Sequence, residues 1–248
     1  MFDRSLFFEH VPAVLAPWFP DDKPIWFILG HIKDAIYAIV NSCPGEYNEI
    51  RDGVFVSVNA KIDKHIEFYG PAIIGKNSEI RHGAFLRENV IIGDNCVVGN
   101  STELKNSVLF DNVEVPHFNY IGDSILGNYA HLGAGVKISN VLLVKNKREK
   151  VEETKKNMTD GKLERKEVKI KMPDGEWVST ELAKFGAIIG DYVEIGVNAT
   201  INPGTALEIN MFVPSSLSIG GYFRADYVFP RSIIYASDSH KSGKHCSN

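Results

Sequence analysis

The chain has 248 residues and a formal net charge of −4 at pH 7. This length accommodates one large domain with a modest additional segment, and the small negative charge gives no overall attraction to nucleic acid or to an anionic membrane. The three cysteines, Cys43, Cys96 and Cys246, are too few and too scattered for a disulfide framework or a zinc site, which fits a reducing cytoplasm and predicts no bound metal.

Residues 1–50 differ in composition from the rest of the chain, because they are rich in aromatic residues and are interrupted by prolines that divide them into short helical pieces. We expect a helix from Ile25 to about Asn41, after a helix start of the type Asp-Asp-Lys-Pro. This apolar stretch contains charged residues and is too short to cross a bilayer, and no signal peptide is recognised. We interpret residues 1–50 as a helical cap over the open first coil of the next domain; a docking helix is the alternative.

A bulky apolar residue then occurs at every sixth position from Val56 to Leu104. A period of six fits neither a helix nor a simple strand, and it predicts a parallel β-solenoid in which three flat faces close one triangular coil. The pattern slips by one residue twice and continues to Ile138, and it returns from Ile189 to Val213. We therefore assign residues 51–236 to one all-β repeat domain, and residues 237–248 to a disordered tail.

The period is absent between residues 141 and 183, which we predict to be an insertion that protrudes from one corner of the solenoid. Its first half, Lys145 to Lys166, is basic, with nine Lys or Arg against five Asp or Glu. Its second half has a hairpin signature around Pro173-Asp174-Gly175. The insertion could hold a polyphosphate ligand or cover a site, and a solvated charged loop is the alternative.

One part of the repeat carries residues with chemical potential: Val115-Pro-His117-Phe-Asn-Tyr120-Ile-Gly122-Asp123, then Leu132-Gly-Ala-Gly and Asn140. This pattern resembles the acetyltransferase domain of the bacterial bifunctional N-acetylglucosamine-1-phosphate uridyltransferase/glucosamine-1-phosphate acetyltransferase family, in which the same elements occur at the same separations. The resemblance covers about residues 75–205 without the insertion. It implies a left-handed parallel β-helix built from hexapeptide repeats, acetyl-CoA as co-substrate and a homotrimer with its sites between subunits.

The resemblance also implies roles for individual residues. They are a catalytic base at His117, phosphate contacts at Arg87 and Lys105, sugar contacts at Tyr120, Asn140 and Lys184, and a backbone contact to the thioester at Ala134. For each of these residues an ordinary structural role is the alternative: a surface histidine, solvated charges, a packed tyrosine ring, a turn asparagine.

The chemistry requires groups of this kind. An amine attacks a thioester only when it is neutral, so a base is needed, and a positioned histidine typically contributes about 10²- to 10⁴-fold to the rate. A backbone N–H in a glycine-rich turn can approach the thioester oxygen. A guanidinium and an ammonium suit a phosphate dianion. We therefore predict an acetyl-CoA-dependent N-acetyltransferase that acts on a phosphorylated amino sugar similar to glucosamine 1-phosphate.

Several positions depart from the family pattern. Val141 replaces a tyrosine, His131 replaces an asparagine, and no glycine-rich nucleotidyltransferase signature is found, so uridyl transfer is not expected. A non-catalytic or regulatory β-helix module derived from a sugar nucleotidyltransferase is one alternative. A metal-dependent carbonic anhydrase is another, but it needs three converging histidines with two close in sequence, a pair that is missing among His65, His82, His117 and His131.

Overall fold

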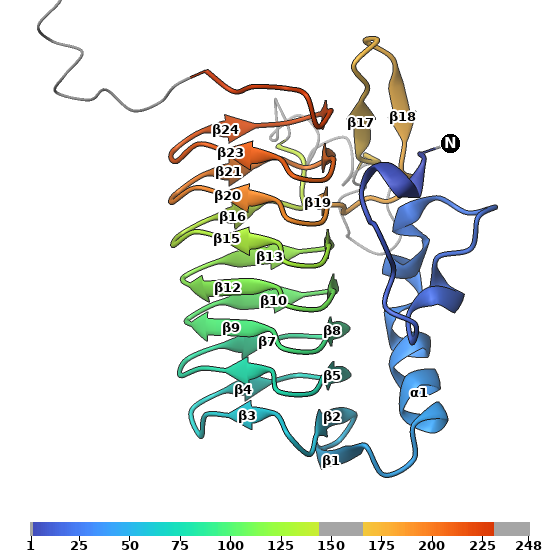
Figure 1. The fold of residues 1–248 in the computed structure, drawn as a ribbon, viewed down its shortest axis with the longest axis vertical. Helices are drawn as coiled ribbons and strands as arrows, with labels where there is room; N and C mark the ends of the chain where they lie inside the picture. The colour runs from blue at the N-terminus through green and yellow to red at the C-terminus, as the bar shows by residue number, and fades with distance from the viewer. Residues whose placement is uncertain (1, 144–165, 231–248) are drawn as a thin grey trace, which may run out of the picture.

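The structure is a computed structural model that describes residues 2–143 and 166–230 (Figure 1). Strands of successive coils stack into three sheets, which form the faces of a triangular prism. The predicted fold is confirmed: the domain is a left-handed parallel β-helix. We call the three sheets face A, face B and face C, in the order in which the chain crosses them.

The strands of each face pair with those of the coils below and above, in parallel except for β1 and β2. Face A contains β1 (Tyr47–Arg51), β2 (Val54–Ser57), β5 (Ala72–Ile74), β8 (Val90–Ile92), β11 (Ser107–Leu109), β14 (Ile125–Leu126), β19 (Ala187–Ile189), β22 (Thr205–Leu207) and β25 (Tyr222–Phe223). Face B contains β3 (Lys61–Ile62), β6 (Glu79–Ile80), β9 (Val97–Asn100), β12 (Glu114–His117), β15 (His131–Leu132), β20 (Glu194–Ile195) and β23 (Phe212–Val213). Face C contains β4 (Glu67–Phe68), β7 (Phe85–Leu86), β10 (Glu103–Lys105), β13 (Tyr120–Gly122), β16 (Lys137–Ile138), β21 (Thr200–Ile201) and β24 (Ser218–Ile219).

The core of the prism consists of the aliphatic residues that recur every six positions. On face C, for example, Leu86, Leu104 and Ile121 lie opposite one another on successive coils and are fully buried. Because side chains alternate across a strand, the residues on either side of each core residue point outward. Potential functional side chains therefore lie one position before or after a core residue, or at the corners.

Many corners of the coil require a residue in the left-handed region of backbone conformation. Asparagine tolerates this region better than most residues because its short side chain forms local hydrogen bonds. Seven asparagines adopt a positive φ in the described residues: Asn77, Asn89, Asn95, Asn106, Asn112, Asn198 and Asn210.

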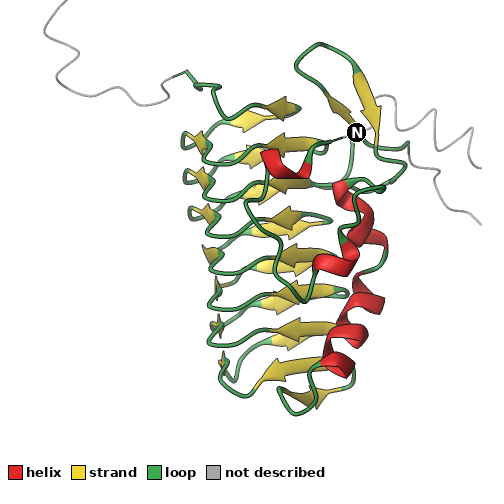
Figure 2. Cartoon of the chain, turned by 45° about the vertical axis from the view of Figure 1, so that its right-hand side comes forward, coloured by secondary structure: helices red, strands yellow, loops and turns green. Residues whose placement is uncertain are grey.

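The helices of the N-terminal segment lie beside the prism, and the edge of the first coil is covered by β1, which pairs antiparallel with β2. The segment contains η1 (Arg4–Leu6), η2 (Ala16–Trp18), η3 (Ile25–Gly30) and α1 (Ile32–Ser42). These helices lie along the outer side of face A (Figures 1 and 2). Their apolar side chains form a second core with the outward residues of that face, among them Ile73, Ile91, Val108, Ile125 and Ile188.

The predicted helix from Ile25 to Asn41 is interrupted. Its first part, η3, is a 3-10 helix, and α1 begins only at Ile32. His31 between them has φ −129° and ψ 12°, outside the helical region, and the preceding Gly30 lowers helix propensity.

The predicted hairpin in the insertion is confirmed. It consists of β17 (Lys169–Lys171) and β18 (Trp177–Ser179), paired antiparallel. The hairpin is more than a solvated loop, because Val168 and Ile170 are fully buried in the second core and the indole N–H of Trp26 donates to the Thr180 carbonyl at 3.1 Å. The basic half of the insertion lies almost entirely outside the described residues, as does the predicted tail 237–248.

Candidate active site

Arg87 and Lys105 lie side by side at the corner where the chain passes from face C to face A, which we call the C–A corner. They occupy the same register position on neighbouring coils, one residue after the core residues Leu86 and Leu104. The backbone N–H of Arg87 donates to the Leu104 carbonyl at 2.9 Å. The Lys105 side chain is 12% exposed and that of Arg87 is 32% exposed, so both cations are held close to the surface of the prism.

Two carboxylates accompany these cations. Arg87 Nη1 donates to Glu103 Oε1 at 3.0 Å, and Glu88 lies 3.2 Å from Lys105 Nζ and 3.6 Å from Arg87 Nε. Burial acts to raise the pKa of Glu88, but hydrogen bonds from its own backbone and from Lys105, with the charge of Arg87, lower it below its usual value. The pKa of Arg87 is raised, chiefly by its hydrogen bond to Glu103. Arg87 and Glu88 are therefore charged at neutral pH, and the cluster places two basic side chains against two acidic ones.

Tyr120 and Asn140 lie next to this cluster. Tyr120 is opposite Glu103 on the next coil, and its hydroxyl donates to Asn140 Oδ1 at 3.4 Å. Asn140 is buried, and its amide donates to Asp123, which also accepts from Asn106 Nδ2 at 3.0 Å. Burial raises the pKa of Tyr120, and Glu103 and Asp123 raise it further. The hydroxyl is thus neutral and available as a donor, while Asn140 also stabilises the corner.

His117 and Ala134 lie together at the other end of face C, at the corner where the chain arrives from face B, which we call the B–C corner. Glu114 pairs with His131, and the same register continued by three residues places His117 opposite Ala134; the His117 carbonyl accepts from Gly135 N–H at 2.9 Å. The His117 side chain is exposed. Lys137 Nζ donates to the carbonyls of Phe118 and Gly135, at 2.7 and 2.8 Å, and so connects the two turns that carry His117 and Ala134.

The predicted site residues thus form two groups rather than one. Arg87, Lys105, Tyr120 and Asn140 are at or next to the C–A corner, and His117 with Ala134 is at the B–C corner. His117 lies opposite Asn100, which is five residues before Lys105 on the coil below. Along one coil, five residues limit the distance between two Cα atoms to about 17 Å. Tyr120 begins the strand between the corners, three residues after His117 in the chain, and so connects the two groups.

Lys184 lies at the C–A corner, where the chain returns from the insertion to the prism. The N–H of the next residue, Phe185, donates to the Asn140 carbonyl at 3.0 Å, so both ends of the insertion meet there. The Lys184 side chain is half-buried. The insertion therefore begins and ends beside the predicted phosphate contacts.

Sequence reasoning assigned no role to the carboxylates Glu88, Glu103 and Asp123, although Asp123 belongs to the motif. Two of them were visible: Glu88 directly follows Arg87, and Glu103 is two residues before Lys105 on the same side of a strand. His131, which replaces an asparagine of the family pattern, lies on face B. Its Nδ1 is 2.7 Å from Oε2 of Glu194, on the strand of the next coil.

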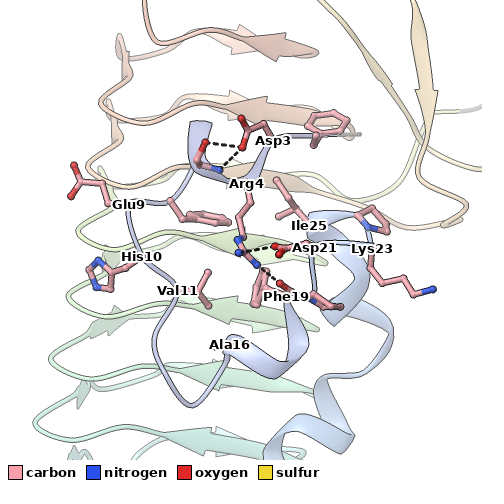
Figure 3. A pocket seen from close by; sticks show the side chains of 15 residues that line it. Asp3, Arg4, Glu9, His10, Val11, Ala16, Phe19, Asp21, Lys23 and Ile25 are labelled. Carbon is pink, nitrogen blue, oxygen red and sulfur yellow. Dashed lines mark hydrogen bonds and ion pairs between the residues drawn. The ribbon is translucent and has the colours of Figure 1, made fainter.

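Two cavities in the described part of the chain lie away from these residues, against the N-terminal segment. The larger, about 790 Å³, is lined by residues between Phe2 and Ile25, and there Arg4 donates to the Phe19 carbonyl and to Asp21 (Figure 3). The smaller, about 270 Å³, lies between that segment and face A. Within residues 2–143 and 166–230, no three His, Cys, Asp or Glu side chains are placed to hold a metal ion, and no helix there has the length and apolar character needed to cross a membrane.

Comparisons with known proteins identify relatives of this chain. The family model of the GMPPB C-terminal domain matches residues 68–172. The bifunctional sugar-1-phosphate nucleotidylyltransferase/acetyltransferase of Sulfurisphaera tokodaii is 30% identical over 199 residues, which is 73% of this chain and 41% of that protein. The bifunctional protein GlmU of Methanococcus aeolicus is 29% identical over 211 residues, 77% of this chain and 46% of that protein. The chain is a homologue of GlmU-type bifunctional proteins.

The resemblance recognised in the motifs is therefore confirmed, and the chain spans less than half the length of these two GlmU-type relatives. Among solved structures, a hexapeptide transferase family protein from Anaplasma phagocytophilum covers 74% of this chain and 80% of its own, with 17% identity and a TM-score of 0.33. A GDP-perosamine N-acetyl transferase from Caulobacter crescentus covers 66% and 50%, with 14% identity and a TM-score of 0.23. At these scores neither structure adds to the argument.

Proposed function

We propose that this chain is an acetyl-CoA-dependent N-acetyltransferase that acts on a phosphorylated amino sugar of the glucosamine 1-phosphate type. The observation that carries the proposal is the pairing of Arg87 with Lys105 on one face whose opposite corner carries His117 and Ala134. The relatives' names, which include a bifunctional sugar-1-phosphate nucleotidylyltransferase/acetyltransferase, support the same chemistry.

In the proposed reaction the acceptor lies along face C. Its phosphate contacts Arg87 and Lys105, since a guanidinium and an ammonium on neighbouring coils can each bind a different phosphate oxygen. The O–H of Tyr120, midway along the face, turns from Asn140 Oδ1 and donates to a sugar oxygen. Asn140 and Lys184, at the C–A corner, complete the sugar contacts. This orientation directs the amino group toward the B–C corner.

The acyl transfer takes place at the B–C corner. The neutral amine attacks the thioester carbonyl, a C–N bond forms, and the C–S bond breaks with release of coenzyme A as a thiol. A ring nitrogen of His117 accepts the proton that the amine loses, and the backbone N–H of Ala134 donates to the developing oxyanion. Lys137 is a positioning residue, because it fixes the two turns that bear these groups. We further propose a homotrimer in which a neighbouring subunit closes the face.

Thiol release from acetyl-CoA tests the base directly, with a panel of amino sugar phosphates as acceptors. We expect His117→Ala to lower kcat by about 10²- to 10⁴-fold. The matched control is His82→Ala, because His82 is an exposed histidine in the same column of the B–C corner, two coils below His117. Equal rates for His117→Ala and the unmodified chain would refute the assignment.

One observation favours a second candidate function. Glu88 and Glu103 neutralise the two cations, which is the state expected of a β-helix module that has lost its substrate and serves assembly or regulation. In that case no thiol would be released from acetyl-CoA with any acceptor in the panel.

A further inference from the structure

The carboxylate of Glu88 occupies the place that the proposed phosphate would take. Its Oε1 lies 3.2 Å from Lys105 Nζ and its Oε2 lies 3.6 Å from Arg87 Nε. Each oxygen therefore faces a different cation, as two oxygens of a bound phosphate would. Glu103, by contrast, contacts Arg87 through Nη1 only, so the two carboxylates are not equivalent.

Arg87 has a donor that the protein leaves unused. Its Nε is buried and has no hydrogen-bond partner, one of two such side-chain atoms in the described part of the chain. A buried donor without a partner carries a desolvation penalty, and at 3.6 Å Glu88 is too distant to remove it. An anion with more compact oxygens, placed within hydrogen-bond distance, would satisfy this N–H.

The Glu88 side chain can also move away from Lys105 and Arg87. Its side chain is 40% exposed, while that of Lys105 is only 12% exposed, so the carboxylate can turn into solvent while the cations stay in place. Its departure would change the balance of the site from two cations and two carboxylates to two cations and one carboxylate. A dianion would then meet a net positive charge.

We propose that Glu88 is a specificity-determining residue, an internal carboxylate that a phosphate must displace from Arg87 and Lys105 before the acceptor can bind. This inference rests on the proposed function, in which those two residues contact the acceptor phosphate. Glu88 lowers the affinity of the site for every anion, and only an anion that contacts both cations and the free Nε replaces it. Weak monoanions are thereby rejected.

Isothermal titration of the full chain with inorganic phosphate at pH 7 tests the inference. Glu88→Gln removes the charge at nearly constant shape, and we expect phosphate to bind about two- to fivefold more tightly, the range that loss of one partly exposed competing ion pair allows. The control is Glu79→Gln. Glu79 forms a similarly exposed ion pair with Arg81 at 3.0 Å on face B, and its substitution should leave the affinity unchanged.

A second variant locates the effect. Adding Arg87→Met to Glu88→Gln should abolish the gain, and thermal unfolding should show that all variants remain folded. The inference is overturned if Glu88→Gln binds phosphate no more tightly than the unmodified chain, or if neither binds it. If Glu88→Gln gains affinity but no variant releases thiol from acetyl-CoA, the proposed acetyl transfer fails and the role of Glu88 stands. If acetyl transfer is observed but Glu88→Gln changes neither phosphate affinity nor acceptor KM, the role of Glu88 alone fails.

Discussion

At the scale of single residues, a ladder of acidic and amide side chains stabilises the corner between face A and face B. Asp94 accepts from the backbone N–H of Lys76 at 2.7 Å, and Asp111 accepts from that of Asp94 at 2.8 Å. Asn128, on the next coil, accepts from the backbone N–H of Asp111 at 3.3 Å. The same corner position thus works with a carboxylate or with an amide, because what each coil needs there is an acceptor.

This ladder predicts that Asp111→Asn stabilises the protein at neutral pH. Burial raises the pKa of Asp111, and the charge of Asp94 raises it further. A raised folded-state pKa means that the folded chain holds its proton more tightly than the unfolded chain, so stability is lost as pH rises from the unfolded value through the folded one. The amide keeps the acceptor and removes the charge, and we expect a gain of up to about 1 kcal/mol at pH 7.

Urea unfolding at pH 4 and pH 7 measures the effect. The difference between the two pH values should be smaller in Asp111→Asn than in the unmodified chain. Asp226→Asn serves as the control, since the Asp226 side chain is 83% exposed. A loss of stability at pH 7 would show that the carboxylate charge is itself needed at this corner.

At the scale of elements, the six-residue period was enough to predict the coils, because every coil repeats the same inward positions. The packing of the N-terminal segment against face A was not predicted, although the sequence contains a pattern that indicates it. Face A carries consecutive apolar residues, as in Ile73-Ile74 and Ile91-Ile92, and both residues of each pair are buried. A strand that is apolar on both sides is covered on both sides, and this feature identifies face A as the covered one.

The positions of the site residues could be predicted from the regular repeat, but the contacts between their side chains could not. Register along a regular coil follows from counting residues, so the pairing of Arg87 with Lys105 could be inferred. The neutralising contacts of Glu88 depend on how side chains orient at a corner, which residue spacing does not determine.

The hairpin of the insertion provides a prediction at this scale. Ile170 is fully buried against the second core, and Ile170→Ala should lower the free energy of unfolding by about 2 to 5 kcal/mol if the hairpin unfolds with the prism. Trp177→Ala, on the partner strand, removes a larger but 60% exposed side chain and should have a much smaller effect. Equal effects of the two substitutions, measured by urea unfolding, would show that the hairpin is not anchored through Ile170.

At the scale of the whole molecule, the proposed homotrimer needs a surface that a second prism can cover. The B–C corner beside His117 and Ala134 carries exposed apolar side chains, Phe118 at 57% and Val197 at 46%. Val197 follows Ala134 in the same column, since the N–H of its neighbour Asn198 donates to the Ala134 carbonyl at 2.9 Å. If subunits meet at this corner, the acyl site and the interface share residues.

Val197→Asp should then separate the trimer and remove acetyl transfer together. Desolvating an unpaired carboxylate in an interface is strongly unfavourable, so sedimentation equilibrium should give the mass of one chain, 27.6 kDa, where the unmodified protein gives three times that value. The control is Val58→Asp, because Val58 is 59% exposed at the first coil of the prism, far along the chain from the site. A site shared between subunits would be contradicted if the unmodified chain sediments as a monomer. It would also be contradicted if the Val197→Asp variant stays trimeric and fully active. A Val197→Asp monomer that keeps its acetyl transfer would show instead that one prism holds the whole site.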